Sequence, residues 1–381
     1  MSVTAETRIA RHACHVCLVS QQATPNFIPV LDKRFRPQRV ILVVSPDMRE
    51  RASWLQTALV QKGIAVTLYD IDDPWNVQRL QDQLLELLVK EAATDLALNV
   101  TGGTKPMAIA AQEVFRAEDK PVFYVHPERG EVIPLFREAQ PFHIQESVQI
   151  PDYLGIHGYH ERSRDTREFS EECYTLARDW IKEVERFARP LARLNGLAQD
   201  CKKTLCVAVP DHAREPHVWE MIDTLREHGL ARVNGSQLVF PDEESRFFVN
   251  GGWLELHVAG VVQGLNGLQV QDSARSLKVE SPEHARNELD VAVLARNRLF
   301  LIECKTKGMK ERAGAAPGAD ALYKIDSLTA LGGLNTRAMI VSYQPLETQD
   351  KQRARDLKID IIEGGELRNL RRHLESSITR N

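Results

Sequence analysis

The N-terminal part of the sequence alternates short apolar runs with amphipathic segments. Apolar residues recur at helical spacing between the runs, for example from Leu80 to Leu88. This alternation predicts a mostly parallel sheet covered on both faces, which is a Rossmann-like domain. Ligands of such domains bind at the carboxyl ends of the strands. The apolar runs are HVCLVS and the segments 40–44, 65–69, 96–100 and 122–125.

Cys14 and Cys17 form a C-x-x-C pair at the first run, and His12 and His15 interleave with them. No second C-x-x-C or H-x-x-x-H completes a zinc site, so we interpret the pair as small side chains packed in a buried strand. Six cysteines in 381 residues do not make a disulfide framework.

A glycine-bearing loop follows the run at 96–100, where the chain reads TGGTKPM before an alanine-rich helix. Thr104 can cap that helix. Gly102 and Gly103 let backbone N–H groups approach a ligand closely, and Lys105 adds positive charge to the helix start. The spacing is neither a Walker A loop nor G-x-G-x-x-G. We therefore predict an anion site at the loop from Thr101 to Lys105.

Polar residues follow two other predicted strands at the same edge of the sheet. Singly, each of them is typical of a turn or cap, but together they can line a cleft for a nucleotide. They are Ser20, Gln21, Thr24, Asn26 and Ser45.

The predicted organisation is α/β in three parts. Residues 1–150 form the Rossmann-like domain, 151–248 a helical connector with a winged-helix-like module, and 249–381 a restriction-endonuclease-like α/β domain. The stretch 151–200 is charged and helical in spacing, with no strand signal. A helix, a stop at Gly229 and two short strands turned at Asn234-Gly235 follow. The acidic residues of that helix favour a structural or dimer-spacing role over DNA reading.

The C-terminal domain carries a candidate cutting site. Asp290 lies on one predicted strand, and Glu303 and Lys305 lie on the next, so a hairpin brings the carboxylates near each other. Period-two alternation points Glu303 and Lys305 to one face. With the main-chain carbonyl of Cys304, the two carboxylates make an oxygen-rich site for Mg2+ or Mn2+. Glu255, on the helix that opens the domain, is a third carboxylate candidate.

Composition limits the partners. The residues are 43% hydrophobic and 27% charged, with a formal net charge of -4, which is typical of a soluble globular protein. Because no global basic field is present, nucleic acid must be held by local patches or by metal. No stretch approaches the roughly 20 apolar residues that span a bilayer, and the N-terminus lacks a secretory signal, so we expect a cytoplasmic protein without a membrane partner.

Taken together, these motifs resemble the CRISPR-associated Rossmann fold (CARF) nucleases of type III CRISPR systems, which join a CARF domain to a PD-(D/E)xK nuclease domain. The likeness spans essentially the whole chain. It is carried by VTGGTKPMA in the first domain and by NGGWLE, RNELDVA, IECKTKGM, ALYKIDSL and LGGL in the last.

The resemblance implies a homodimer that binds a cyclic oligoadenylate, most typically cyclic tetraadenylate, and then cuts nucleic acid. The sequence has no evident aromatic stacking run or basic stripe, so we expect single-stranded RNA or DNA to be cut without sequence specificity. It implies catalytic roles for Asp290, Glu303 and Lys305, with Glu255 as the helix carboxylate, and activator binding by the loop from Thr101 to Lys105. We also expect the glycine-bearing segment 308–320 to order over the site.

Two alternatives stay open at this point. A winged-helix transcription regulator with a CARF sensor uses the first and middle parts but leaves the carboxylates without a task. A constitutive restriction-like endonuclease uses the last domain and ignores the anion loop.

Overall fold

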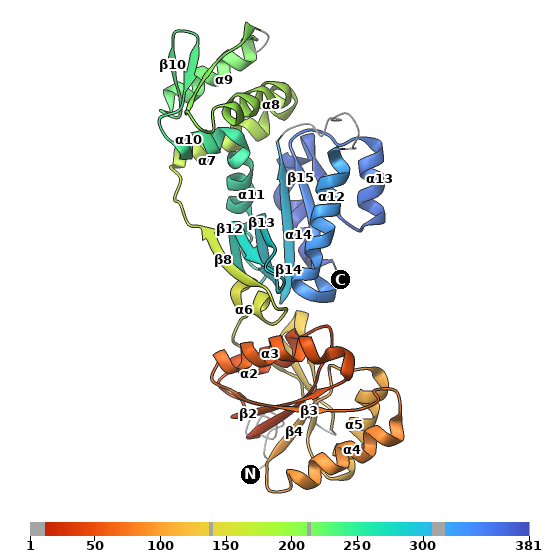
Figure 1. The fold of residues 1–381 in the computed structure, drawn as a ribbon. Helices are drawn as coiled ribbons and strands as arrows, with labels where there is room; N and C mark the ends of the chain where they lie inside the picture. Colours follow the sequence, from red (N-terminus) through yellow and green to blue (C-terminus); the bar gives the residue numbers. More distant parts are fainter. Residues whose placement is uncertain (1–11, 137–139, 212–214, 307–316, 381) are drawn as a thin grey trace.

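The chain folds into two α/β domains with a smaller helical module at one end (Figure 1). The structure is a computed structural model and describes residues 12–136, 140–211, 215–306 and 317–380. The segment 307–316, which holds most of the glycine-bearing segment expected to order over the site, lies outside the described residues.

The N-terminal domain is built on a seven-stranded sheet in the order β3-β2-β1-β4-β5-β6-β7. Strands β1 to β5 are parallel, and β6 and β7 are antiparallel additions at one edge. The predicted Rossmann-like domain is confirmed. The strand order reverses between β1 and β4, which makes the carboxyl ends of these two strands the switch point where such sheets bind ligands. The strands are β1 (Cys14–Leu18), β2 (Arg39–Val44), β3 (Ala65–Asp70), β4 (Leu96–Asn99), β5 (Val122–His126), β6 (Glu131–Pro134) and β7 (Phe142–His143).

Helices cover both faces of this sheet. Phe27 and Leu55 of α2 and α3 pack on one face, and Leu84 and Phe115 of α4 and α5 pack on the other. Cys14 and Cys17 are buried in β1, and all six cysteines are free, as the strand interpretation predicts. The helices are α2 (Thr24–Leu31), η1 (Pro46–Met48), α3 (Arg49–Gln61), α4 (Val77–Lys90), α5 (Lys105–Ala117) and η2 (Pro127–Arg129).

The C-terminal domain contains a six-stranded sheet in the order β16-β15-β14-β13-β12-β8. The predicted hairpin is present as β13 and β14, and its turn residues Arg296 and Asn297 have φ of 53° and 55°. The strands are β8 (His160–Asp165), β12 (Val270–Glu280), β13 (Arg286–Ala295), β14 (Arg298–Lys305), β15 (Arg337–Ser342) and β16 (Asp360–Glu363). The helices are α11 (Trp253–Gln263), α12 (Pro317–Leu328), η5 (Thr329–Asn335), α13 (Thr348–Asp356), η6 (Gly364–Asn369) and α14 (Leu370–Thr379).

Strand β8 corrects the prediction of a connector without strands. It pairs antiparallel with β12 at the edge of the C-terminal sheet. Its sequence HERSRD has no apolar alternation because ion pairs join it to its neighbour, with Arg162 2.6 Å from Glu280 and Arg164 3.0 Å from Asp272. Sequence periodicity detects burial, and an edge strand bound through charges shows little of it.

The helical module contains the predicted helix and hairpin. Helix α9 (Pro216–Glu227) ends before Gly229, and β10 (Arg232–Asn234) and β11 (Gln237–Val239) flank the predicted turn. The remaining elements are α7 (Glu171–Lys182), α8 (Val184–Asp200), β9 (Cys206–Ala208), α10 (Glu243–Phe247) and η4 (Phe248–Gly252).

One continuous hydrophobic cluster joins the two α/β domains. It contains Phe27 of α2, Tyr153 of α6 (Ile150–Gly155) and Leu299 and Leu301 of β14. The side of the first sheet that carries α2 and α3 faces the C-terminal domain (Figure 1). None of the helices described is both long enough and apolar enough to cross a membrane.

Candidate active site and ligand-binding edge

The candidate cutting site lies where β13 and β14 stop pairing. Their register runs from Ala295 opposite Arg298 to Val291 opposite Ile302, and Asp290 and Glu303 are the first residues beyond it. The two strands part at this point, so both carboxylates face the opening. The Cys304 N–H donates to Oδ2 of Asp290 over 2.7 Å and holds that carboxylate across the gap.

Glu303 receives two lysines. Lys305 Nζ lies 2.5 Å from Glu303 Oε1, and Lys324 Nζ lies 3.2 Å from the same oxygen. Lys305 was predicted, whereas Lys324 of α12 was not. The sequence places Lys324 at an exposed position of an amphipathic helix, and nothing local to it signals an approach to a strand 21 residues away.

The alternation along β14 is as predicted. Phe300 and Ile302 belong to the hydrophobic cluster on one face of the sheet, and Leu299 and Leu301 belong to the cluster on the other, together with Leu322 of α12. Glu303 and Lys305 continue the second set, so they turn toward α12.

Glu255 of α11 approaches the site from the other face of the sheet. Its Oε2 accepts a hydrogen bond of 3.0 Å from Ser276 Oγ. Burial, and then the negative charge of Asp290, raise the pKa of Glu255 above its ordinary value. Within the described residues, no three His, Cys, Asp or Glu side chains are gathered as a set that can hold a metal ion. That Glu255 binds a second metal or holds a metal-bound water stays a prediction.

The charges of the site act on one another. Burial, and then Glu303, raise the pKa of Asp290. Burial alone lowers the pKa of Lys305, but the carboxylates of Glu303 and Asp290 outweigh it, and the pKa of Lys305 is raised. Lys305 is thus held as a cation against the carboxylates.

The two strand carboxylates fit a hard divalent cation. Asp290 and Glu303 come from adjacent strands, and Mg2+ is typically held by one or two carboxylates, with water and substrate phosphate completing its shell. The main-chain carbonyl of Cys304 between them remains a predicted ligand. Glu303 is 4% exposed, so its charge needs a cationic partner in every state of the site.

The ligand-binding edge lies at the carboxyl ends of β1, β4 and β5. Thr101 Oγ1 donates to Asn99 Oδ1 over 2.6 Å and accepts from the Val125 N–H over 2.7 Å. Its hydroxyl therefore fastens the loop to β5. Thr104 caps α5 as predicted, accepting from the Met107 N–H over 3.3 Å, and donates to the Pro74 carbonyl over 3.1 Å.

Two glycines bring the loop against the end of β1. A Cβ at Gly102 would overlap the Leu18 carbonyl and lie 3.4 Å from Ser20 Oγ, so the segments after β1 and β4 are in contact there. Gly103 has φ of +72°, a backbone conformation that residues other than glycine rarely adopt. Lys105, at the start of α5, is exposed.

Three of the predicted ligand residues are buried and hydrogen-bonded within the protein. Asn26 donates to the Leu18 carbonyl over 2.8 Å and accepts from Asn99. Thr24 accepts from Gln22, and Ser45 donates to Asp47 over 2.6 Å. All three side chains are buried. They hold the edge in shape. Ser20 and Gln21 are at least partly exposed, and so are the residues of the loop from Thr101 to Lys105 except Gly102, which is buried.

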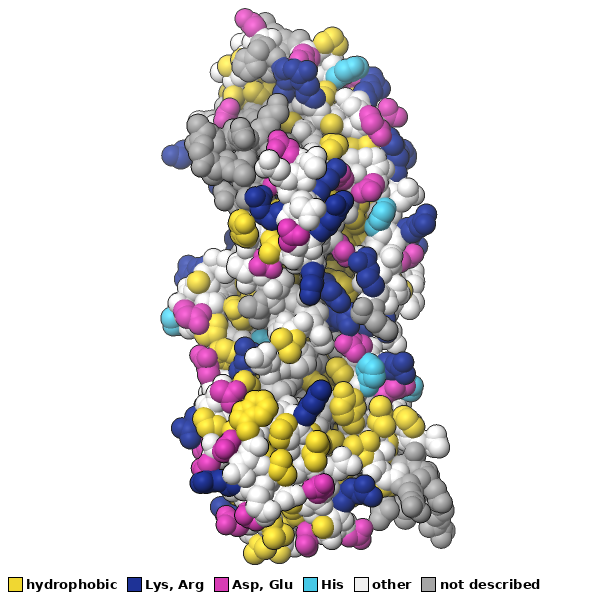
Figure 2. All heavy atoms as spheres, turned by 90° about the vertical axis from the view of Figure 1, so that its right-hand side faces the viewer, with side chains coloured by type: hydrophobic (Ala, Val, Ile, Leu, Met, Phe, Trp, Pro, Cys, Tyr) yellow, Lys and Arg dark blue, Asp and Glu magenta, His cyan; other side chains and the backbone are white. Residues whose placement is uncertain are grey.

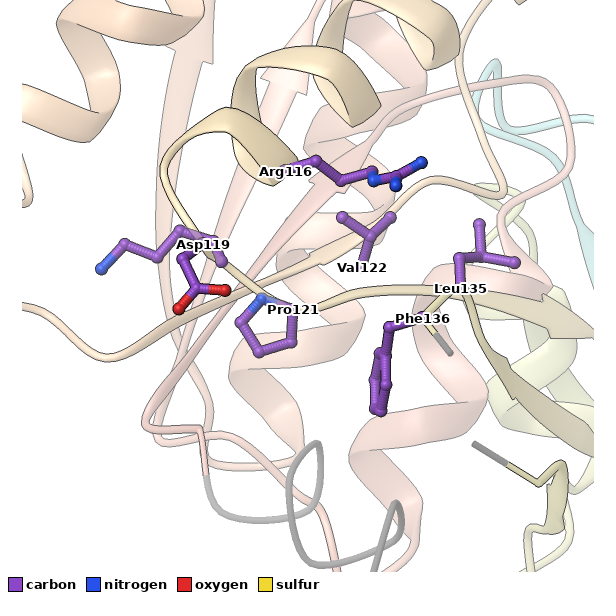
Figure 3. Close-up of a pocket in the computed structure, with 7 residues that line it drawn as sticks. Arg116, Asp119, Pro121, Val122, Leu135 and Phe136 are labelled. Atoms are coloured by element: carbon purple, nitrogen blue, oxygen red, sulfur yellow. The ribbon is translucent and has the colours of Figure 1, made fainter. Parts of the chain in front are cut away.

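A cavity of about 270 Å³ lies on the side of the sheet where the parallel strands begin, opposite their carboxyl ends (Figure 3). Arg116, Asp119, Pro121 and Phe136 line it, together with Lys120, at the amino end of β5. None of the predicted activator residues takes part in it. It is therefore separate from the switch-point edge.

The ligand-binding edge contacts the C-terminal domain directly. A Cβ at Gly333 of η5 would lie 2.7 Å from His157 Cε1 and 3.1 Å from Gln22 Oε1. The Tyr153 hydroxyl donates to the carbonyl of Gly332 over 2.9 Å.

The two α/β domains meet a second time at η2, the short helix that follows β5. Asn297 at the tip of the β13–β14 hairpin donates to the Pro127 carbonyl of η2 over 2.8 Å, and Arg298 lies 2.9 Å from Glu128. The loop at Thr101 is bonded to β5, and the β13–β14 hairpin is bonded to η2, which follows β5 directly.

Two family models match the chain. Residues 14–153 match the Card1 CARF domain, and residues 242–380 match the endonuclease domain of Card1-like proteins. A comparison with curated proteins finds no match.

Solved structures are similar over the whole chain. Protein VC1899 from Vibrio cholerae is 30% identical, with 96% of this chain and 97% of that chain covered and a TM-score of 0.86. Can2 from Sulfobacillus thermosulfidooxidans, solved in complex with cyclic tetra-adenylate, is 25% identical, with 99% and 100% covered and a TM-score of 0.80. A type III CRISPR defence DNA nuclease activated by cyclic oligoadenylate is 18% identical, with 89% and 47% covered and a TM-score of 0.54, a likeness of fold alone.

Proposed function

The chain belongs to the Card1-like family of CARF-domain endonucleases, and from this we propose that it is a nuclease of type III CRISPR defence that a cyclic oligoadenylate switches on. The family model of the last domain supports the endonuclease activity. The similarity to Can2, solved with cyclic tetra-adenylate, supports that ring as the activator.

One observation carries the gating part of the proposal. The segment after β1, at the ligand-binding edge, packs against Gly333, and Gly333 lies in η5, which continues directly from α12. Helix α12 places Lys324 on the carboxylate of Glu303. A ligand that moves the edge therefore acts on an element that reaches the cutting site. Only a difference in affinity between two arrangements shifts the equilibrium between them.

The activator is expected to contact the edge through its phosphates. Gly102 and Gly103 leave room for backbone N–H groups, and the start of α5 and Lys105 provide positive charge. Ser20 and Gln21 border the same place. The hydroxyl of Thr101 has partners within the protein, so its proposed role is to shape the loop.

A homodimer is part of the proposal. Hydrophobic side chains gather over the N-terminal domain in Figure 2, and α4 packs against α5 there. Trp75, Leu85, Val89 and Ile109 are 70%, 45%, 70% and 55% exposed. Exposed apolar patches of this kind mark protein interaction sites. Trp75 follows Pro74, whose carbonyl accepts a hydrogen bond from Thr104 of the anion loop. A two-fold ring of phosphates suits a two-fold protein site.

For cleavage, Asp290 and Glu303 are the residues that would hold Mn2+ or Mg2+, which supplies positive charge to the scissile phosphate when bound. Lys305 keeps its ammonium group beside that position, where it orients the attacking water and balances the negative charge of the transition state. Asp290 is kept in place by the Cys304 N–H. Glu255 and Ser276 border the site from the α11 side.

The proposed substrates are single-stranded RNA or DNA, cut without sequence specificity in the cytoplasm. The net charge of -4 provides no global attraction, so the strand is held near the site itself. A transcription regulator is less well supported, because acidic residues of α9 face solvent, with Glu220 paired to Arg186 and Asp223 to Arg226.

The test is a cleavage assay on single-stranded RNA, single-stranded DNA and plasmid in Mn2+ or Mg2+, with and without cyclic oligoadenylates of different ring size. We expect cutting only with metal and activator together. Absence of cutting under every condition would contradict the nuclease proposal. Cutting that does not depend on the activator would contradict the gating.

A further inference from the structure

Lys324 contacts the cutting site from α12, an element outside the hairpin of β13 and β14 that holds Asp290 and Glu303. Its Nζ lies 3.2 Å and 3.4 Å from the two carboxylate oxygens of Glu303, and Lys305 shares the nearer oxygen. Two ammonium groups thus serve one buried carboxylate. Asp290 is the other carboxylate of the opening, so two ammonium groups balance two carboxylates. A divalent cation held by Asp290 and Glu303 would take over part of that balance and leave Lys324 able to meet an anion.

The two lysines differ in where they lie. The side chain of Lys305 is 30% exposed and that of Lys324 is 43% exposed, while the side chain of Glu303 alone is 5% exposed. Lys305 therefore sits inside the opening between β13 and β14, and Lys324 sits at its rim. A polyanion that arrives from solvent meets the ammonium of Lys324 before that of Lys305.

The backbone under Lys324 is well anchored. Leu322, Ile325 and Leu328 of α12 are buried in the cluster that joins the two domains. Helix α12 continues into η5, where Gly333 meets Gln22 and His157. The position of Lys324 is thus set by packing that extends to the ligand-binding edge.

We propose that Lys324 is a substrate-binding residue of the cutting site. When the nucleic-acid strand binds, the ammonium of Lys324 moves away from Glu303 and contacts a phosphate of the strand beside the scissile bond. The inference rests on the proposed nuclease function and deepens it. Lysine suits this contact because its ammonium is a mobile point charge on a flexible stem, and it reads phosphate without reading sequence. It also supplies the local attraction that the overall charge of the protein does not.

The test measures binding of a labelled single strand by fluorescence anisotropy at several salt concentrations. It uses the full chain with activator and metal, and every protein carries Asp290→Asn so that the strand is not cut. Lys324→Met and Lys324→Arg are compared with this parent. Lys351→Met is the matched control. Lys351 lies on the neighbouring helix α13, is also half-exposed, and is paired with a carboxylate, that of Glu363 on β16.

Loss of one phosphate contact is expected to weaken binding about tenfold and to reduce the slope of log K against log salt by about 0.7. Lys324→Arg should restore both values, and Lys351→Met should change neither. In proteins that retain Asp290, Lys324→Met should raise KM for the strand about tenfold.

Two outcomes overturn the inference. The first is a Lys324→Met variant that binds the strand as the parent does. The second is weaker binding with an unchanged salt slope that arginine does not restore, which indicates a structural role. These results differ from failure of the proposed function, in which the protein with all its native residues cuts no substrate with any activator.

Discussion

At the scale of single residues, the cutting site depends on one local event, the end of pairing between β13 and β14. Asp290 and Glu303 are the first residues past the last paired position, Val291 opposite Ile302. One position closer to the turn, at Val291 or Ile302, each carboxylate would lie between paired strands beside apolar neighbours. The spacing between the two carboxylates matters because it matches the length of this hairpin.

The role of Asp290 is tested by two substitutions. Asp290→Ala should lower the cleavage rate about 100-fold or more, because it removes one of the two carboxylates that hold the metal. Asp290→Asn keeps an oxygen for the Cys304 N–H and removes only the charge, so it should be equally inactive. Gel-based rates and calorimetric activator titrations report the two functions, and activator affinity should be unchanged. Normal cutting by either variant would show the metal assignment to be wrong.

Lys105 is the charged residue of the anion loop. Lys105→Glu should weaken activator binding about tenfold or more, because it replaces an attraction to phosphate by a repulsion. The site itself should still cut when the activator is saturating. Lys120→Glu changes the net charge equally but lies at the opposite edge of the sheet, in the cavity of Figure 3, and should bind the activator normally. Equal effects of the two variants would argue against a specific contact.

At the scale of elements, the pair α4 and α5 combines two tasks. Their inward faces carry Leu84, Leu87 and Phe115 into the core of the first domain. Their outward faces carry apolar side chains to the surface, which burial within this chain does not explain. The start of α5 is also the positive end of the anion loop.

The exposed apolar side chains of α4 and α5 predict that the dimer contact lies on the outward faces of these two helices. Ile109→Glu on α5 should shift the protein toward monomer, because a charge on an interface side chain must lose its water. Val60→Glu is the control, since Val60 is 54% exposed on α3 where Ile109 is 55% exposed on α5. Analytical ultracentrifugation gives the oligomeric state of each. A dimer that tolerates Ile109→Glu would place the contact elsewhere.

At the scale of the whole molecule, the two α/β domains are joined by a shared core and by close contacts at Gly333 and Asn297. A rigid junction of this kind transmits displacement, since packed groups have few alternative arrangements. The division into segments ending near residues 150 and 248 stays a proposal, and limited proteolysis of the intact chain can test it.

Gly333 provides a test of this junction. Gly333→Ala places a Cβ 2.7 Å from His157 Cε1 at φ of +70°, whereas Gly235→Ala meets nothing within 4 Å at φ of +60°. Gly235→Ala bears a backbone cost of about 1–2 kcal/mol. Gly333 also has ψ of -157°, a region that is essentially restricted to glycine, so Gly333→Ala bears a backbone cost of about 1–3 kcal/mol and must move its neighbours as well. Thermal unfolding should show the larger loss for Gly333→Ala, and the cleavage assay should show weaker stimulation by activator. Equal stimulation in both variants would remove Gly333 from the gating path.

His157 makes the junction sensitive to acid. Burial, and to a smaller extent Arg51, lower its pKa from 6.5 to about 4, and its Nε2 has no hydrogen-bond partner among the described residues. The unfolded chain therefore binds this proton at a higher pH than the folded chain. The stabilisation is complete above pH 6.5 and is lost as the pH falls to about 4, by about 3 kcal/mol.

Denaturant titrations between pH 7 and pH 4 can measure this loss. His157→Gln cannot titrate and should show a smaller decrease in unfolding free energy over the same interval. The difference between the two proteins isolates His157 from the carboxylates that also titrate in acid. Parallel curves for both proteins would contradict the assignment.

The sequence alone determined many elements of the fold. The strand and helix alternation of the first domain, the capped loop at Thr104, the module with its turn at Asn234-Gly235, and the hairpin of β13 and β14 all follow from local spacing and turn chemistry. Local signals suffice there because each element is set by neighbours within a few residues, through periodicity, capping and backbone conformation.

The tertiary structure alone decided what distant segments do to one another. It turned HERSRD into an edge strand, buried Asn26 and Ser45, gave Glu255 a hydrogen bond from Ser276, and brought Lys324 to Glu303. Each of these outcomes depends on the path of the chain between segments far apart in sequence. The pattern around a single residue records whether that residue is buried, and it does not record which remote group will be its partner.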